Sequence, residues 1–161
     1  MNNYFLKALN QENEAPYIPV WLLRQAGRYM PEYREVRSQY KDFFEMIKKP
    51  EICKELTLQP LNAFDLDAAI TFTDILTIPD ALGLKVNFVK GKGPIFEKSL
   101  SSMDKLDLNT NEFHDKIQYV YSATSLIKEN VNVPLIGFTG SPWTLFVLSL
   151  IHISEPTRPM N

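Results

Sequence analysis

Three short apolar runs, each about as long as a β-strand, alternate with stretches of helical periodicity along this chain. They lie at residues 18–23, 68–72 and 134–138. Strands that are apolar along their whole length and are separated by helices are typical of a parallel sheet covered on both faces. The sequence therefore predicts an α/β fold. In α/β barrels the active site lies at the carboxyl ends of the strands.

The other predicted elements follow from periodicity and from proline and glycine positions. They are helices at 3–10, 32–39, 43–48, 50–64, 74–82, 112–130 and from 141 onward, a helix start at 101–104, and an edge strand at 86–89. Gly83 is expected to end one helix, and Gly91–Pro94 to form a tight turn. A complete (β/α)8 barrel takes about 250 residues. The 161 residues here therefore predict an incomplete part of such a barrel.

The composition excludes several classes of protein. A net charge of −2 offers no field that would attract nucleic acid or an anionic membrane. No apolar run is long enough to cross a bilayer, and the first residues lack the basic and apolar regions of a signal peptide. The single cysteine, Cys53, fits a reducing compartment. We therefore expect a cytoplasmic location and no nucleic-acid or membrane partner.

Arginine is concentrated in one short segment. Four of the five arginines fall within fourteen residues, while the positive charge elsewhere is almost entirely lysine. The planar guanidinium binds carboxylate or phosphate through two parallel hydrogen bonds, which the ammonium group of lysine cannot do. The segment therefore indicates an anion site. The four residues are Arg24, Arg28, Arg34 and Arg37.

The turn Arg24-Gln25-Ala26-Gly27-Arg28 directly follows the first apolar run. Two guanidinium groups four residues apart, with the amide of Gln25 beside one of them, can hold several carboxylates. Gly27 allows the backbone to approach a ligand closely or to adopt a positive φ. The alternative is a surface turn whose arginines pair with Glu32 or Glu35. The spacing alone leaves both interpretations open.

Asp74 lies at the end of the second apolar run. A carboxylate there either caps the following helix or faces a cavity, where it can stabilise positive charge or accept N–H groups. From the spacing alone the capping role is favoured. Cys53 lies at an apolar helical position and is predicted to be a core residue. No cluster of Cys, His and carboxylates predicts a zinc site, and no glycine motif predicts a dinucleotide.

Three segments of the chain resemble signature segments of the uroporphyrinogen decarboxylase family, and they occur in the family's order. They are Pro19–Tyr33, Thr71–Leu76 and Gly137–Leu145, and the resemblance covers residues 1 to about 147. Leu23 stands where the family usually has methionine, which is a volume-conserving exchange. The resemblance implies the N-terminal part of a (β/α)8 barrel enzyme that forms homodimers and needs neither metal nor organic cofactor.

The resemblance also implies an activity and a set of site residues. The family removes carbon dioxide from the four acetate side chains of uroporphyrinogen III, which gives coproporphyrinogen III in haem biosynthesis. By motif, Arg24 and Arg28 would bind substrate carboxylates, and Arg24 would also assist proton delivery. Gln25, Ala26 and Gly27 would complete the binding loop. Asp74 would accept the pyrrole N–H groups and stabilise the cationic intermediate.

The resemblance ends near residue 147. The family has a substrate-contacting tyrosine where this chain has Leu148, and the following residues have no counterpart in it. We therefore expect residues 148–161 to be a non-native tail and the 161-residue chain to be truncated. On this view it is an inactive fragment or a weak tetrapyrrole binder. A corrinoid or coenzyme methyltransferase of the same superfamily is the other enzymatic alternative, which the loop Arg24–Arg28 disfavours.

Overall fold

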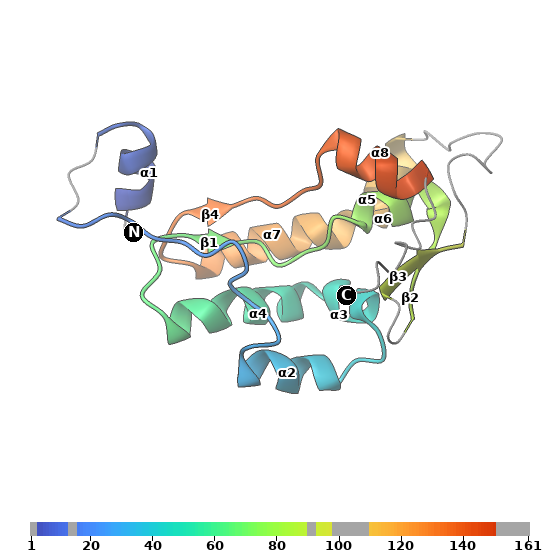
Figure 1. Ribbon diagram of the computed structural model, residues 1–161, viewed down its shortest axis with the longest axis horizontal. Coiled ribbons are helices and arrows are strands. Elements are labelled where there is room, and N and C mark those ends of the chain that lie inside the picture. Colours follow the sequence, from blue (N-terminus) through green and yellow to red (C-terminus); the bar gives the residue numbers. More distant parts are fainter. Residues whose placement is uncertain (1–2, 13–15, 90–92, 98–109, 151–161) are drawn as a thin grey trace, which may run out of the picture. The chain divides into compact units, whose positions relative to one another are not determined.

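The structure is a computed structural model that describes residues 3–12, 16–89, 93–97 and 110–150. The chain divides into two compact units, whose helices and strands are labelled in Figure 1. Residues 1–74 and 118–138 form the first unit, and residues 75–117 and 139–161 form the second. Three chain crossings therefore connect the units, after residues 74, 117 and 138.

The first unit is built around a short parallel sheet. Strand β1 (Ala69–Ile70) pairs with strand β4 (Leu135–Ile136), with Ala69 opposite Leu135 and Ile70 opposite Ile136. Helix α4 (Pro50–Ala63) precedes β1, helix α7 (Gln118–Asn130) precedes β4, and these two helices pack together. Because each strand follows a helix and the strands are parallel, this unit confirms the predicted α/β class.

The core of the first unit is apolar and closed. Leu56 of α4 and Ile127 of α7 are completely buried, and so are Ala69 of β1 and the preceding Ala68. The remaining helices are α1 (Tyr4–Leu9), α2 (Pro31–Ser38) and α3 (Phe43–Ile47). Proline occupies the first turn of both α2 and α4, where its missing N–H costs nothing. All of these predicted helices are confirmed within one or two residues.

The first apolar run is a wrong prediction, because residues 18–23 form no strand. Pro19 has no N–H to offer a neighbouring strand. The N–H of Val20 donates to the side chain of Asp67 at 2.8 Å rather than to a strand carbonyl. Ile18 and Leu23 are 82% and 69% exposed. The apolar pattern therefore predicted a buried segment, but the described residues do not cover it.

The second unit contains short helices and a hairpin. Helix α5 (Thr77–Pro79) runs into the π-helix η1 (Asp80–Leu84), where Gly83 has a φ of 90°. This left-handed conformation favours glycine, and it ends the helical geometry as predicted. Strand β2 (Val86–Val89) is confirmed. It pairs antiparallel with strand β3 (Gly93–Phe96), so Gly93 and Pro94 belong to a strand and not to the predicted turn.

One long helix was predicted at 112–130, and the structure confirms it except for one break. The structure has helix α6 (Thr110–Lys116) and then α7, with a break at Ile117 where the chain passes between the units. Helix α8 (Pro142–Leu150) begins as predicted, because Oγ of Ser141 accepts the N–H of Thr144 at 3.2 Å. The predicted helix start at 101–104 and residues 151–161 of the expected tail lie outside the described residues.

Candidate functional site

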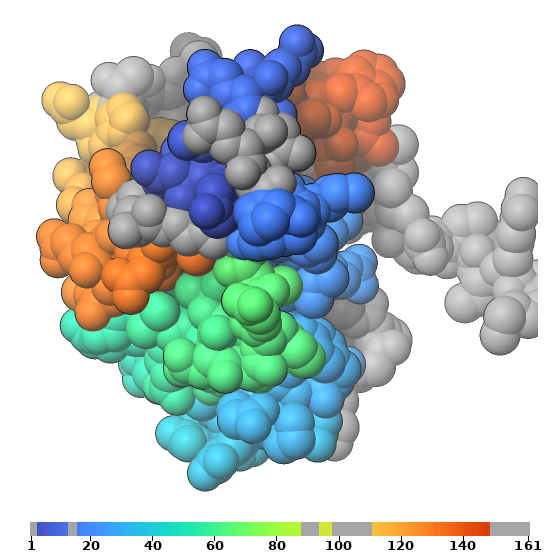
Figure 2. All heavy atoms as spheres, turned by 90° about the vertical axis from the view of Figure 1, so that its left-hand side faces the viewer, coloured from blue at the N-terminus to red at the C-terminus, as the bar shows by residue number. Residues whose placement is uncertain are grey.

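Residues 17–20 are held against the residues that lead into β1. One carboxylate oxygen of Asp67 accepts the hydroxyl of Tyr17 at 2.6 Å, and the other accepts the N–H of Val20 at 2.8 Å. The N–H of Asp67 donates in turn to the carbonyl of Val20 at 2.9 Å. Figure 2 shows this blue N-terminal segment lying over the green residues before β1. Sequence reasoning missed Asp67, whose only signal was a carboxylate at the start of an apolar run.

Gln25 continues this attachment along β1. Its side chain is 2% exposed. Nε2 donates to the carbonyl of Ala68 at 2.6 Å, and Oε1 accepts the N–H of Ile70 at 3.0 Å. The N–H groups of the alternate residues Ala69 and Thr71 donate to the β4 side of the sheet at 2.9 and 3.0 Å. The amide of Gln25 therefore occupies the edge of β1 opposite β4.

The turn from Arg24 to Tyr29 is closed by hydrogen bonds to its own backbone. The hydroxyl of Tyr29 donates to the carbonyl of Gln25. Nη1 of Arg34 donates to the carbonyls of Arg28 and Tyr29, at 2.8 and 3.2 Å. A side chain from the following helix, α2, therefore fixes the end of the turn. Arg34 has a structural role that its place in the arginine cluster did not reveal.

Gly27 owes its place to close packing rather than to a positive φ. Its φ lies outside the left-handed region. A Cβ built on Gly27 would come within 3.3 Å of the Tyr29 ring. Ala26 beside it is half-buried. The predicted positive φ at Gly27 is therefore wrong, and the close neighbour of Gly27 in this structure is the ring of Tyr29.

Arg24 and Arg28 differ from the other two arginines. Both are exposed, and neither side chain makes a hydrogen bond or an ion pair in the part of the chain that the structure describes. The alternative in which they pair with Glu32 or Glu35 is therefore wrong. Arg37, by contrast, donates to the carbonyl of Tyr40 at 2.7 Å. Two guanidinium groups remain available for an anion.

Asp74 is half-buried and follows β1 in the same compact unit as the arginine turn. The N-cap position of α5 is Leu76, two residues after Asp74. The residues between β1 and Asp74 are supported from α4. The hydroxyl of Thr57, which is buried, accepts the N–H of Phe72 at 3.2 Å and donates to the carbonyl of Cys53 at 2.8 Å. Thr57 also escaped sequence reasoning, because a threonine inside a helix gives no signal.

Burial changes the pKa values of two side chains in the first unit. Burial raises the pKa of Tyr33, while the nearby Arg37 and Arg28 lower it. Burial raises the pKa of Cys53 to about 12, and its thiol donates to the carbonyl of Ile47 at 3.1 Å. Such a thiol is protonated and inert at neutral pH. The prediction that Cys53 is a core residue is confirmed.

In the third signature segment, Gly140 is closely packed within the second unit. A Cβ on Gly140 would lie 2.6 Å from Cδ2 of Leu145 and 3.2 Å from Cβ of Ile75. Only glycine fits there without movement of the neighbours. Among the residues that the structure describes, no three His, Cys, Asp or Glu side chains could hold a metal ion. Over the same residues, no helix has the length and apolarity needed to cross a membrane.

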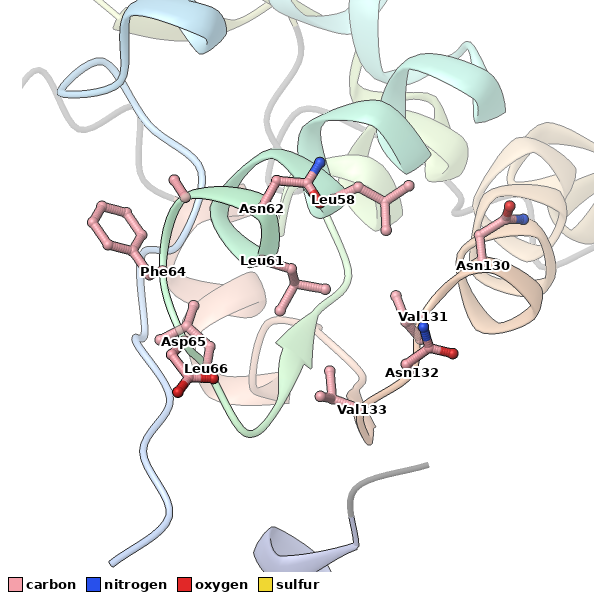
Figure 3. A pocket seen from close by; sticks show the side chains of 11 residues that line it. Leu58, Leu61, Asn62, Phe64, Asp65, Leu66, Asn130, Val131, Asn132 and Val133 are labelled. Carbon is pink, nitrogen blue, oxygen red and sulfur yellow. The ribbon is translucent and has the colours of Figure 1, made fainter.

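A pocket of about 480 Å³ lies elsewhere in the first unit (Figure 3). Its walls come from the end of α4 and from the residues that follow α7, including Leu61, Phe64, Asp65, Val131 and Val133. These residues lead into the amino ends of β1 and β4. None of the predicted site residues lines the pocket. The candidate site therefore consists of the exposed arginine turn and Asp74.

The comparisons with known proteins agree on one fold class, the α/β barrel. A methyltransferase from Methanosarcina mazei aligns with a TM-score of 0.64 at 22% identity, over 93% of this chain and 44% of that one. The described residues make up part of such a barrel, with no closed ring of strands among them.

The family follows from the sequence comparisons. The family model described as uroporphyrinogen decarboxylase matches residues 1–152. The chain belongs to the uroporphyrinogen decarboxylase family. It is 49% identical over 150 residues to a uroporphyrinogen decarboxylase of Francisella philomiragia and 50% identical over 149 residues to one of Vibrio campbellii. These alignments cover 90% and 89% of this chain, and the chain spans 42% and 41% of those relatives.

Proposed function

We propose that this chain supplies the carboxylate-binding loop and the catalytic carboxylate of an enzyme that converts uroporphyrinogen III to coproporphyrinogen III in haem biosynthesis. One observation carries the proposal. Arg24 and Arg28 are the two arginines of the cluster whose guanidinium groups have no partner among the described residues. The relatives' names supply the substrate class, because uroporphyrinogen carries many carboxylates.

The loop from Arg24 to Arg28 binds substrate carboxylates in this proposal. Each guanidinium can form two parallel hydrogen bonds to one carboxylate. The backbone of Ala26 and Gly27 lies between the two groups and completes the binding surface. In this proposal Arg24 also assists proton delivery. A guanidinium stays protonated in proteins and is a poor acid, so binding is the main role of Arg24.

Asp74 stabilises positive charge in this proposal. The reaction begins when a proton adds to the pyrrole carbon that bears the acetate group. The bond to the carboxylate carbon then breaks, carbon dioxide leaves, and the electron pair moves into the ring. A second proton completes the methyl group. A carboxylate that accepts the pyrrole N–H groups lowers the energy of the cationic intermediate, which is electrostatic catalysis.

A chimeric enzyme tests the proposal. Residues 1–145 of this chain would replace the aligned residues of the Francisella philomiragia relative. The chimera should release carbon dioxide from uroporphyrinogen III and accumulate coproporphyrinogen III. Asp74→Asn in the chimera should lower kcat by at least about 100-fold, as expected for the loss of a group that stabilises transition-state charge. A folded chimera with full activity after Asp74→Asn would overturn the role of Asp74.

The 161-residue chain by itself is a separate case. We expect it to bind uroporphyrin, the oxidised and stable form of the substrate, without turning over uroporphyrinogen III. Carbon dioxide release above that of an Asp74→Ala variant would contradict this expectation. The proposal also includes a cytoplasmic location, which the single cysteine supports. It further includes a homodimer of the full-length form, which light scattering of the chimera can test.

A further inference from the structure

We propose that Gln25 is a positioning residue whose side-chain amide acts as a substitute peptide group on the free edge of β1. It thereby sets the place from which Arg24 and Arg28 reach the substrate. This inference deepens the proposed function and rests on it. It assigns Gln25 a role different from the substrate contact that its place in the loop predicts.

The geometry of β1 supports this role. A strand in a sheet offers alternate N–H and C=O groups to its two sides. On one side of β1, the N–H groups of Ala69 and Thr71 donate toward β4. On the other side, the carbonyl of Ala68 and the N–H of Ile70 meet the amide of Gln25, at 2.6 and 3.0 Å. One amide therefore satisfies a donor and an acceptor as a neighbouring strand would.

The state of Gln25 also argues against a contact with substrate. Its side chain is 2% exposed, and both ends of the amide are bonded to the backbone of β1. A contact with a ligand would leave backbone groups of Ala68, which is buried, and of Ile70, which is half-buried, without partners, at a cost of up to about 1–3 kcal/mol for each. The flanking Arg24 and Arg28 are exposed. The buried residue therefore holds the chain, and the exposed residues reach outward.

The first test removes the amide from the 161-residue chain without adding charge. In Gln25→Met, amide hydrogen exchange should accelerate at least about tenfold at Ile70, because this N–H loses its acceptor. The amides of Ala69 and Thr71 should keep their protection, because their acceptors lie on the β4 side. Gln39→Met is the matched control, since Gln39 is exposed and also belongs to the first unit. Unchanged exchange at Ile70, or equal acceleration at all three amides, would overturn the proposal.

The second test asks whether Gln25 acts through the arginines. Gln25→Met should weaken uroporphyrin binding by about tenfold, which equals about 1.4 kcal/mol. In a chain that already carries Arg24→Met and Arg28→Met, the same change should have no further effect on the affinity. Such non-additivity is expected when one residue acts through others. An undiminished tenfold loss in that background would show direct contact between Gln25 and the ligand, and would refute the positioning role.

The third test replaces the amide with a carboxyl group, which can form both hydrogen bonds only when it is protonated. In Gln25→Glu, the ionised carboxylate has no donor for the carbonyl of Ala68 and is repelled by it, so it should leave the edge of β1 and remove the acceptor of the Ile70 N–H. The protonated acid has both a donor and an acceptor and can stay. Protection of Ile70 and affinity for uroporphyrin should therefore be low at pH 8 and recover together toward pH 5. Gln39→Glu should show no such recovery. Recovery in neither property would contradict the substitute-peptide role, even if Gln25→Met proves too unstable to study.

These results distinguish the two proposals. If the unsubstituted chain does not bind uroporphyrin and exchange at Ile70 still responds to Gln25→Met, the proposed function fails while the attachment through Gln25 stands. If the chain binds uroporphyrin and Gln25→Met alters neither exchange nor affinity, the positioning role fails while the proposed function stands.

Discussion

Polar side chains attach residues 17–29 to β1 on one side of this segment and are available for a ligand on the other side. On the attached side, Asp67 accepts hydrogen bonds from Tyr17 and Val20, and Gln25 forms hydrogen bonds with the backbone of Ala68 and Ile70. On the exposed side, Arg24 and Arg28 make no hydrogen bond or ion pair among the described residues. The difference teaches that the attachment of this segment does not depend on its charges. Its arginines can therefore bind an anion without releasing the segment from β1.

Removal of the Asp67 carboxylate should have the largest effect on folding. Asp67→Ala leaves the N–H of Val20 and the hydroxyl of Tyr17 without their acceptor. The expected loss in the free energy of unfolding is about 2 kcal/mol, because hydrogen bonds to a charged group contribute about 1.5–3 kcal/mol each and the exposure of Tyr17 and Val20 to solvent reduces that value. Urea denaturation measures this loss. Asp65→Ala is the control, because Asp65 is exposed two residues earlier. Equal stability of the two variants would refute the role given to Asp67.

Removal of the two exposed arginines should affect binding and leave folding unchanged. The double variant Arg24→Met, Arg28→Met should bind uroporphyrin about 100-fold more weakly, which equals about 2.7 kcal/mol. Charge-assisted hydrogen bonds contribute about 1.5–3 kcal/mol each, and solvent exposure reduces that value. Fluorescence titration measures the affinity, and urea denaturation should give an unchanged midpoint. A double variant that loses stability but keeps its affinity would show that these two arginines attach the segment and do not bind the ligand.

The sequence predicted the helices of the first unit well because their signals are local. Pro31 and Pro50 mark first turns, and Asp42 caps α3 by accepting the N–H of Glu45 at 2.8 Å. Residues 18–23 were mistaken for a strand, since an apolar run indicates burial without saying what covers it. The break at Ile117 was also missed. It lies where the chain leaves one compact unit for the other, and periodicity carries no information about that change.

The candidate site was predicted in position but not in the roles of its residues. Composition identified the arginine segment as an anion site, and the family resemblance selected Arg24, Arg28 and Asp74. Composition alone could not separate Arg28 from Arg34, because the bond of Arg34 to the carbonyl of Arg28 depends on the path of the turn. Gln25 was predicted to belong to the binding surface, because the sequence does not show which groups its side chain contacts. Its partners lie more than forty residues away in the sequence.

Arg34 belongs with the structural side chains, and its removal should have a moderate effect. Arg34→Met removes the two hydrogen bonds to the carbonyls of Arg28 and Tyr29. Both bonds are exposed to solvent, so the expected loss in the free energy of unfolding is about 1 kcal/mol. Arg24→Met should leave stability unchanged under the same conditions, measured by urea denaturation. If Arg24→Met costs as much as Arg34→Met, the division of the cluster into two classes fails.

The smallest expected effect is electrostatic and is measured at Tyr33. Burial raises the pKa of this phenol, and Arg37 and then Arg28 oppose the rise. Arg37→Met and, to a lesser extent, Arg28→Met should therefore raise the pKa of Tyr33 further. Arg34→Met should not, although all three variants lose the same charge. Absorbance of the phenolate near 295 nm, with Tyr33→Phe as the reference, reports this titration.

The sign of the Tyr33 effect also predicts a pH dependence. A raised pKa means that the folded chain favours the neutral phenol, so this contribution to stability is complete below about pH 10, the usual tyrosine value. It is lost as the pH rises through the pKa of the folded state. Arg37→Met should make the loss steeper than in the unsubstituted chain, and Tyr33→Phe should abolish it. Equal pKa values of Tyr33 in all three arginine variants would show that Arg28 and Arg37 do not act on this phenol.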